Sequence, residues 1–201
     1  MAEVWKSRGY LPHLDIPGAT QFLTWRLHDA IDPALWEVWR QMYSGDESAR
    51  KIWREAEKQL DQHGGNAYFR RPELAHRVTT AIFSRHGKDC EIRAAVVMPN
   101  HVHLVVTLGE DIELSRFVGQ IKGATSHEIN QVLGRTGSLW QAGYFDRLIR
   151  SSGHLARCVK YVHWNPVKAK LTAHPSWYPH STAYSIWAEK VLSQECSAPE
   201  G

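Results

Sequence analysis

The chain has 201 residues, a net charge of +3 and 43% hydrophobic residues, enough to bury one substantial core, so we expect a single domain. No apolar run reaches the length of a membrane span and the first residues lack the apolar core of a secretory signal, so we expect a cytoplasmic protein without a membrane partner. The three cysteines, Cys90, Cys158 and Cys196, are far apart in the sequence, which argues against a disulfide framework or a thiolate zinc site.

The first half of the chain carries one strand pattern and two helical patterns. After an irregular opening that ends at Pro17-Gly18, the alternating, aromatic-rich run 20–29 predicts a first strand. Apolar residues then recur at helical spacing over 33–62, which predicts a helical hairpin or broken helix inserted after that strand. A further helical pattern covers 72–86. The tryptophans of 33–62 are expected to anchor a core.

The second half of the chain predicts an antiparallel pair of strands and two more long helices. Two apolar runs separated by Pro99-Asn100 have the form of neighbouring strands joined by a tight connection. The expected elements are strands at 90–98 and 102–108, a helix at 112–133, a short strand or extended segment at 140–149, a helix at 153–165 that Pro166 ends or kinks, surface coil at 174–180 and a short helix near 182–192. This mixture without a regular βαβ alternation predicts an α+β fold with an antiparallel sheet.

Two histidines stand one residue apart in the predicted strand after Asn100. Because strand side chains alternate faces, His101 and His103 emerge on the same side, while the aliphatic residues around them fill the other. Packing alone would favour valine or isoleucine at these positions. Neighbouring imidazoles are natural ligands of a divalent ion, so the pair predicts a metal site.

The positive charge of the chain is concentrated in one segment. Residues 122–170 carry a net charge of +6, against −3 for the remainder, and aromatic residues are interleaved with the basic ones. Such a segment suits a groove for a phosphate backbone and stacked bases, although a solvated basic surface would have the same composition. Candidate DNA contacts are Lys122, Arg147, Arg150 and Arg157, with Trp140 and Gln141 placed either to contact a base or to pack.

A tyrosine and an asparagine lie four residues apart in the last long helix. Tyr161 and Asn165 therefore share a helix face, where the asparagine carbonyl adds an oxygen ligand to the ion that the histidines hold. A nearby cation stabilises a phenolate, so Tyr161 suits attack on a phosphodiester. The alternatives are that Tyr161 packs, with Tyr144 as the rival nucleophile, and that Asn165 only ends the helix before proline. His163 points to the opposite side of the helix and is left out of the site.

Several ordered motifs give this chain a family resemblance. They are the opener His13-Leu-Asp-Ile-Pro-Gly-Ala-Thr20, the histidine motif Met98-Pro-Asn-His-Val-His-Leu-Val-Val, Ile121-Lys-Gly-Ala-Thr-Ser-His-Glu-Ile-Asn130, Leu139-Trp-Gln-Ala-Gly-Tyr-Phe-Asp-Arg-Leu-Ile-Arg150 and Lys160-Tyr-Val-His-Trp-Asn-Pro-Val-Lys168. Together they resemble the REP-associated tyrosine transposases, relatives of the single-tyrosine insertion-sequence transposases within the HUH nucleases. The likeness covers most of residues 10–171, and the segment 33–65 is not diagnostic.

The resemblance implies a ferredoxin-like antiparallel sheet with packed helices in one HUH-type domain, with a core at about 19–171 and a C-terminal extension at 172–201. By position, His101 and His103 match the metal pair, Tyr161 the nucleophile and Asn165 the polar ligand. One departure is Lys170, where the related pattern usually has a glycine suited to a helix end, which leaves the chain path there open.

The function that we expect from these residues is metal-dependent cleavage and transfer of single-stranded DNA at hairpins formed by palindromic repeats. Tyr161 would bond to the 5′ phosphate and release a 3′ hydroxyl, with Mg²⁺ or Mn²⁺ as the cofactor. Two alternatives remain open: a DNA-binding protein that recognises repeat hairpins without cutting them, and a hydrolytic metallonuclease in which water attacks. The protein is expected to be a monomer or a homodimer.

Overall fold

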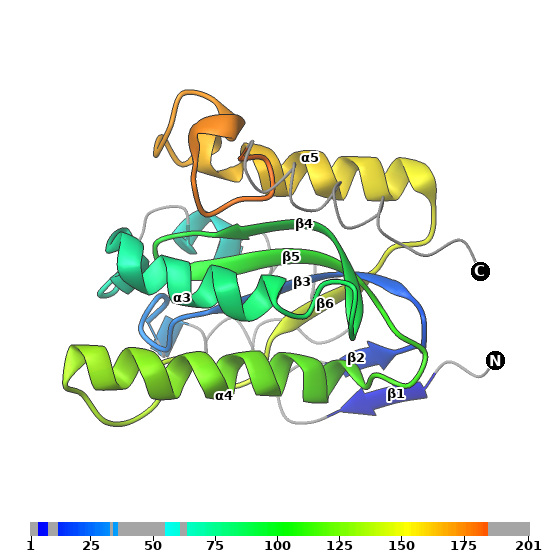
Figure 1. Ribbon diagram of the computed structural model, residues 1–201, viewed down its shortest axis with the longest axis horizontal. Coiled ribbons are helices and arrows are strands. Elements are labelled where there is room, and N and C mark those ends of the chain that lie inside the picture. The colour runs from blue at the N-terminus through cyan, green and yellow to red at the C-terminus, as the bar shows by residue number, and fades with distance from the viewer. Residues whose placement is uncertain (1–3, 8–11, 33, 36–54, 61–63, 185–201) are drawn as a thin grey trace.

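Four antiparallel strands form the sheet on which the rest of the chain packs (Figure 1). The computed structural model describes residues 4–7, 12–32, 34–35, 55–60 and 64–184. The strands are β3 (Thr20–Arg26), β4 (Cys90–Val97), β5 (His101–Leu108) and β6 (Phe145–Leu148), in the spatial order β4-β5-β3-β6. The strand β5 is therefore a central strand, paired on both sides.

Helices cover both faces of this sheet. The helices α3 (Pro72–Phe83) and α4 (Leu114–Leu133) lie on one face, and α5 (Ser152–Lys168) lies on the other (Figure 1). Alternation along β5 sends Leu104 and Val106 into the core under α3 and α4, and Val105 into a second cluster that includes Val162 of α5. The predicted α+β fold with an antiparallel sheet and packed helices is confirmed.

Local signals in the sequence account for the ends of these helices. Pro72 occupies the first turn of α3, where a missing N–H costs no hydrogen bond. Gly134 follows α4 in the left-handed conformation, with φ 60°, and closes that helix. The hydroxyl of Ser151 accepts the backbone N–H of His154 at 3.2 Å and caps the start of α5.

The opening of the chain and the first predicted strand differ from expectation. The prediction of an irregular opening is wrong, because β1 (Val4–Ser7) and β2 (Pro12–Asp15) form a separate antiparallel pair. Strands of four residues, one of them starting at a proline, are too short to show a clear alternation. The strand predicted at 20–29 ends earlier, at Arg26.

Two predicted helical segments fall wholly or largely outside the described residues. Within 33–62, residues 34–35 and 55–60 are helical, and the remaining positions, including the tryptophans, lie outside the described part. The short helix expected near 182–192 also lies mostly outside it. Among the described helices, none is both long and apolar enough to cross a membrane.

The last turn of α5 corrects the expectation for Pro166. The helix does not end before this proline but continues to Lys168, with Asn165 buried inside it. Two hydrogen bonds close the end, from Lys170 N–H to the Val167 carbonyl at 3.0 Å and from Leu171 N–H to the Pro166 carbonyl at 2.9 Å. This is the Schellman arrangement, which normally places glycine in the left-handed position. Lys170 adopts that conformation instead, with φ 58°.

The segment after α5 returns to cover the outer edge of β4. It contains a short 3₁₀ helix, η2 (Pro175–Trp177), and then runs beside the strand. Val97 N–H donates to the His180 carbonyl at 2.9 Å, and Thr182 N–H donates to the Ala95 carbonyl at 2.9 Å. The Tyr178 hydroxyl adds a hydrogen bond to the Val97 carbonyl at 2.9 Å. These bonds satisfy the edge groups of β4.

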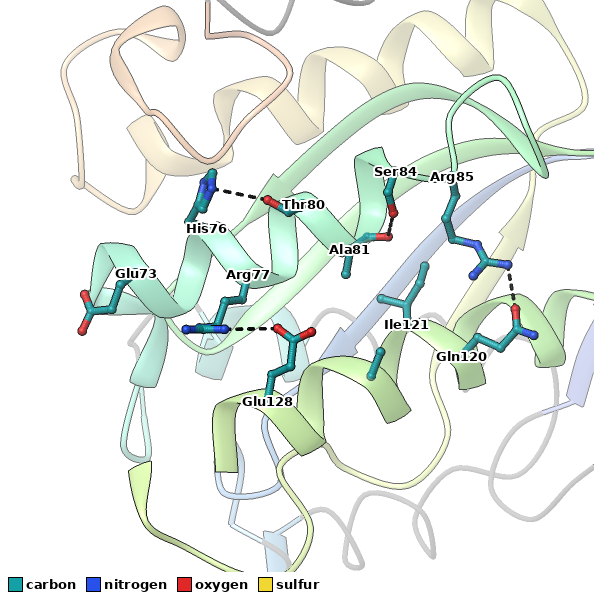
Figure 2. A pocket seen from close by; sticks show the side chains of 11 residues that line it. Glu73, His76, Arg77, Thr80, Ala81, Ser84, Arg85, Gln120, Ile121 and Glu128 are labelled. Atoms are coloured by element: carbon teal, nitrogen blue, oxygen red, sulfur yellow. Dashed lines mark hydrogen bonds and ion pairs between the residues drawn. The ribbon is translucent and has the colours of Figure 1, made fainter. Parts of the chain in front are cut away.

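A groove of about 640 Å³ lies between α3 and α4 (Figure 2). Side chains bridge it: Arg77 donates to Glu128 at 3.3 Å, and Arg85, just after α3, donates to Gln120 at 2.6 Å. The groove is therefore a polar seam between two helices. It lies on the α3 and α4 side of the sheet, opposite the α5 side that His103 faces.

Candidate functional site

The two histidines of β5 face each other across the α5 side of the sheet. Their Nε2 atoms are 3.0 Å apart, and both side chains are fully buried, with exposures of 0% for His101 and 1% for His103. Burial, and then the positive charge of Lys168, lowers the pKa of His103 to about 3, so this imidazole is neutral at physiological pH. A neutral imidazole keeps a lone pair for a cation. The predicted placement of both side chains on one face is confirmed.

Each imidazole is held from behind through its other ring nitrogen. His101 Nδ1 bonds to Asn100 Oδ1 at 2.7 Å, and His103 Nδ1 bonds to the hydroxyl of Thr24 at 2.7 Å. Thr24 lies directly opposite His103 in the pairing of β3 with β5, so the sheet register itself brings the hydroxyl there. Because both Nδ1 atoms are occupied, both Nε2 atoms face the shared space, which is the usual arrangement around metal-binding histidines.

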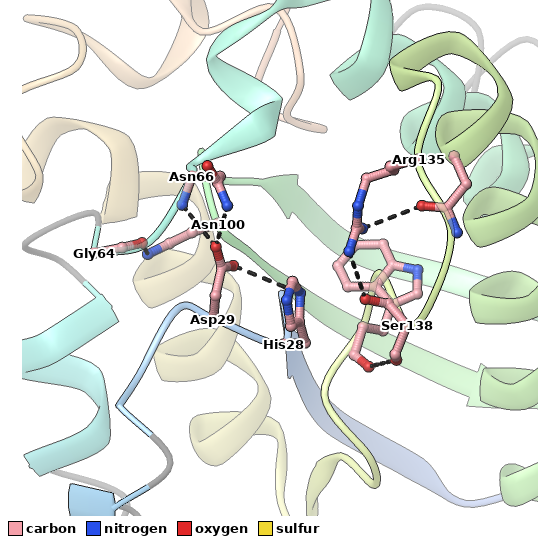
Figure 3. Close-up of polar contacts among 9 residues, drawn as sticks. His28, Asp29, Gly64, Asn66, Asn100, Arg135 and Ser138 are labelled. Atoms are coloured by element: carbon pink, nitrogen blue, oxygen red, sulfur yellow. Dashed lines mark hydrogen bonds and ion pairs between the residues drawn. The ribbon is translucent and has the colours of Figure 1, made fainter.

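Asn100 connects this site to the chain that follows the 55–60 helical segment. Its side-chain amide donates to the Gly64 carbonyl at 3.2 Å, and the neighbouring Asp29 accepts the backbone and side-chain N–H groups of Asn66 at 2.9 and 2.6 Å (Figure 3). A Cβ at Gly65 would lie 2.5 Å from the Asp29 carbonyl oxygen, so that position requires glycine. Asn100 is fully buried and was not identified from the sequence.

Tyr161 and Asn165 of α5 reach the same space from the opposite side. The Tyr161 hydroxyl lies 3.4 Å from His103 Nε2, and Asn165 donates to that hydroxyl through Nδ2 at 3.2 Å. The phenol ring makes edge-on contacts with the stacked rings of Phe22 and His103, with centroid distances of 5.8 and 5.2 Å. The structure thus brings together His101, His103, Tyr161 and Asn165.

A carboxylate that the sequence analysis missed also enters the site. Glu57, in the helical segment 55–60, accepts a hydrogen bond from the Tyr161 hydroxyl at 2.6 Å. Helical spacing in this segment predicts that Ala56 and Leu60 are buried, and the structure confirms it. The same spacing does not indicate which distant residue the Glu57 side chain contacts. No sequence signal could have located Glu57 without the tertiary arrangement.

The donor atoms around this space fit a divalent cation. The carbonyl oxygen of the Asn165 side chain is buried and has no hydrogen-bond partner among the described residues, which is costly unless something else satisfies it. Together with the two Nε2 atoms it gives two nitrogens and one oxygen, a set that suits a transition metal or Mg²⁺ with open positions. Within the described residues, no three His, Cys, Asp or Glu side chains form a group that could hold a metal ion.

Two of the candidate DNA contacts, Lys122 and Trp140, use their side chains within the protein, and Gln141 uses its backbone. Lys122 donates to the carbonyls of Gln141 and Gly143 at 2.8 and 2.7 Å, and burial and then the charge of Arg26 lower its pKa to about 8. Trp140 is 3% exposed and donates to the Thr125 hydroxyl at 3.0 Å, which supports the packing alternative for that residue. Gln141 donates its backbone N–H to the Arg26 carbonyl at 2.9 Å.

Three arginines remain exposed near the start of α5. They are Arg147 of β6, Arg150 before the helix and Arg157 within it. Partial burial and then the positive charges of these arginines lower the pKa of His154. Because all three arginines are exposed, their charges are accessible to a phosphate backbone.

Known proteins match the part of the chain that carries these residues. A family model described as "Transposase IS200 like" matches residues 69–165, a span that contains the two histidines, Tyr161 and Asn165 but not Glu57. A REP-associated tyrosine transposase of Escherichia coli (strain K12) is 32% identical over 99 residues, which cover 49% of this chain and 57% of that protein. The matched region therefore spans a little over half of that relative.

The overall fold also has a counterpart among solved structures. A structure of a REP-associated tyrosine transposase bound to a REP hairpin superposes with a TM-score of 0.56 at 23% identity, covering 95% of this chain and 88% of that one. At this identity the likeness concerns the fold. With the matches to the family model and to the E. coli protein, it confirms the predicted resemblance to REP-associated tyrosine transposases.

Proposed function

We propose that this chain, whose residues 69–165 match the IS200-like transposases, is a metal-dependent endonuclease and strand transferase for single-stranded DNA hairpins. The observation that carries the proposal is the convergence of the Tyr161 hydroxyl on the histidine pair, 3.4 Å from His103 Nε2, across 58 positions of sequence. A packing tyrosine has no need of buried imidazoles beside its hydroxyl.

His101, His103 and Asn165 are the residues that would hold the cation, Mg²⁺ or Mn²⁺. When bound, a divalent cation would polarise a nonbridging phosphate oxygen and favour the anionic form of a neighbouring phenol. The Thr24 and Asn100 side chains keep the two Nε2 atoms directed at that position.

Tyr161 is the proposed nucleophile. Its oxygen attacks the scissile phosphorus and forms a phosphotyrosine bond to the 5′ phosphate, while the bond from phosphorus to the 3′ oxygen breaks. Tyr161 gives up its hydroxyl proton, and the departing 3′ oxygen takes one up to become a 3′ hydroxyl. Attack by such a hydroxyl on the phosphotyrosine reverses these changes and joins two DNA ends.

The substrate class follows from charge and from the relatives. The exposed Arg147, Arg150 and Arg157 form a positive surface suited to a phosphate backbone. The solved relative was bound to a REP hairpin, which supports a hairpin as the substrate of this chain. Lys122 and Trp140 are proposed to contribute by shaping the 140–143 loop, since their side chains already contact the protein.

A covalent adduct tests this proposal directly. Hairpin-bearing single strands, labelled at each end in turn, are incubated with the protein and Mg²⁺ or Mn²⁺, and the products are separated under denaturing conditions. We expect a protein-linked product that carries the 5′ phosphate, located on Tyr161 by mass spectrometry. Tyr161→Phe should form no adduct, whereas Tyr144→Phe, which removes the rival hydroxyl, should retain it.

Other outcomes identify the alternatives. Cleavage without any protein-linked product would indicate a hydrolytic metallonuclease. Salt-sensitive binding without cleavage in either metal would indicate a hairpin-binding protein. An adduct that persists in Tyr161→Phe would disprove the assignment of the nucleophile.

A further inference from the structure

We infer that Glu57 is a further catalytic residue of this centre, the carboxylate that accepts the Tyr161 proton as the phenol oxygen attacks. This inference rests on the proposed function. It concerns a residue outside the family-model match and outside the motifs that carry the resemblance. Glu57 contacts the reacting oxygen atom itself, with its Oε1 atom 2.6 Å from the Tyr161 hydroxyl.

The hydrogen bonds around the phenol determine the direction of its proton. Asn165 Nδ2 donates to the Tyr161 oxygen at 3.2 Å, so that contact uses a lone pair of the oxygen. The hydroxyl proton must then point elsewhere. Glu57 Oε1 lies 2.6 Å away and His103 Nε2 lies 3.4 Å away, and the shorter distance is typical of a charge-assisted O–H···O⁻ bond. The proton therefore points at Glu57.

His103 is unsuited to the same task. Its Nε2 atom faces the Nε2 atom of His101 at 3.0 Å, in the position proposed for the cation. A nitrogen that binds a metal has no lone pair left for a proton. Proton transfer requires an acceptor within about 2.6–3.2 Å, and the Glu57 carboxylate satisfies that distance in the structure.

The helical segment 55–60 is anchored so that this contact is fixed. Ala56 and Leu60, four residues apart on one face, are each 1% exposed and pack in the core under α3 and α4. Glu57 stands beside that buried face and is itself half-buried. The neighbouring Glu55 points outward, where it pairs with Lys58 at 2.8 Å.

The proton transfer completes the balance of the cleavage step. As the bond from the Tyr161 oxygen to phosphorus forms, the O–H bond breaks and its proton moves to a Glu57 oxygen. The bond from phosphorus to the DNA 3′ oxygen breaks at the same time, and that oxygen takes a proton from solvent water and becomes a 3′ hydroxyl. When the strands rejoin, the protonated Glu57 returns the proton to the departing tyrosine oxygen.

The experiment compares single-turnover adduct formation in three proteins, the parent, Glu57→Gln and Glu55→Gln, under the same metal and hairpin conditions. Glu57→Gln keeps the shape of the side chain but cannot take up a proton, so we expect the rate to fall at least about 100-fold. Hairpin affinity, measured by fluorescence anisotropy in the absence of metal, should remain within about twofold. Glu55→Gln makes the same change of charge two positions away in the same helical segment and should retain the parent rate.

Chemical rescue separates proton transfer from a structural role. In Glu57→Ala, added formate can occupy the vacated space and should restore a large part of the lost rate, whereas Tyr161→Phe should not respond. A parent rate in Glu57→Gln, or a slow Glu57→Ala that formate leaves unchanged although its melting temperature equals that of the parent, would overturn the inference. If the parent itself forms no adduct, the proposed function fails.

Discussion

Replacement of Lys170 by glycine should stabilise the protein. Lys170 holds φ 58° directly after α5, a conformation in which a Cβ atom crowds the following carbonyl group. The two hydrogen bonds of the Schellman closure, at 3.0 and 2.9 Å, lock the residue there. The left-handed conformation at this position therefore favours glycine over lysine.

The size of the effect follows from two opposing terms. The left-handed conformation costs a residue other than glycine about 1–2 kcal/mol. Glycine gains more freedom in the unfolded chain, which offsets about 0.5–1 kcal/mol. We expect Lys170→Gly to raise the free energy of unfolding by about 0.5–1 kcal/mol, a shift of about 1–4 °C in melting temperature for a chain of this size.

Urea and thermal unfolding followed by circular dichroism would measure this difference. Lys170→Ala removes the same side chain but keeps the Cβ atom, so its stability should stay close to that of the parent. Lys160→Gly, at an exposed position within α5, should lose about 1 kcal/mol. If Lys170→Gly is no more stable than Lys170→Ala, the strain argument is refuted.

Two further predictions concern the site and its surroundings. Thr24→Val removes the hydroxyl that bonds to His103 Nδ1 and should weaken Mn²⁺ binding by about 10–100-fold in electron paramagnetic resonance titrations. As a control, Thr20→Val removes a hydroxyl that pairs with Thr107 at 2.8 Å and should leave the Mn²⁺ affinity unchanged. Equal Mn²⁺ affinities of the two variants would count against the role of Thr24. Burial and then the charge of Arg26 lower the pKa of Lys122 in the folded protein to about 8, whereas the amine of an unfolded chain has a pKa of about 10.4. Between about pH 8 and about pH 10 the unfolded chain therefore binds more protons at Lys122 than the folded protein does. Raising the pH from about 8 to about 10 should therefore increase the stability of the parent relative to Lys122→Met in urea unfolding, and a constant difference would contradict this.

Periodicity located the histidine pair but could not assemble the site. The side-chain alternation of a strand is set by the local backbone, so the shared face of His101 and His103 was predictable from two positions. The approach of Tyr161 depends on how α5 lies across the sheet, which the family resemblance implied and local pattern did not. Glu57 depends on the same tertiary arrangement, without a motif to mark it.

The helix end expected before Pro166 is absent for a reason that bears on the site. Proline disfavours helical geometry in the residue before it, which made an end at Asn165 the simplest expectation. In the structure the carbonyl of Asn165 accepts the N–H of Ala169 at 2.9 Å, and the Schellman closure adds its two bonds beyond the proline. The buried Asn165 and Pro166 side chains hold the same turn against the core.

Because the helix continues through Pro166, the Asn165 side chain stays within reach of the Tyr161 hydroxyl. Helical geometry at Asn165 maintains its position one turn after Tyr161, and its amide then reaches the phenol oxygen at 3.2 Å. An extended residue at this position would turn the amide away and release the contact that directs the Tyr161 proton toward Glu57. The last turn of α5 thus links Lys170 to the orientation of the phenol. The Schellman closure requires the left-handed conformation of Lys170, and the same closure continues the helix past Asn165, whose amide orients the Tyr161 hydroxyl.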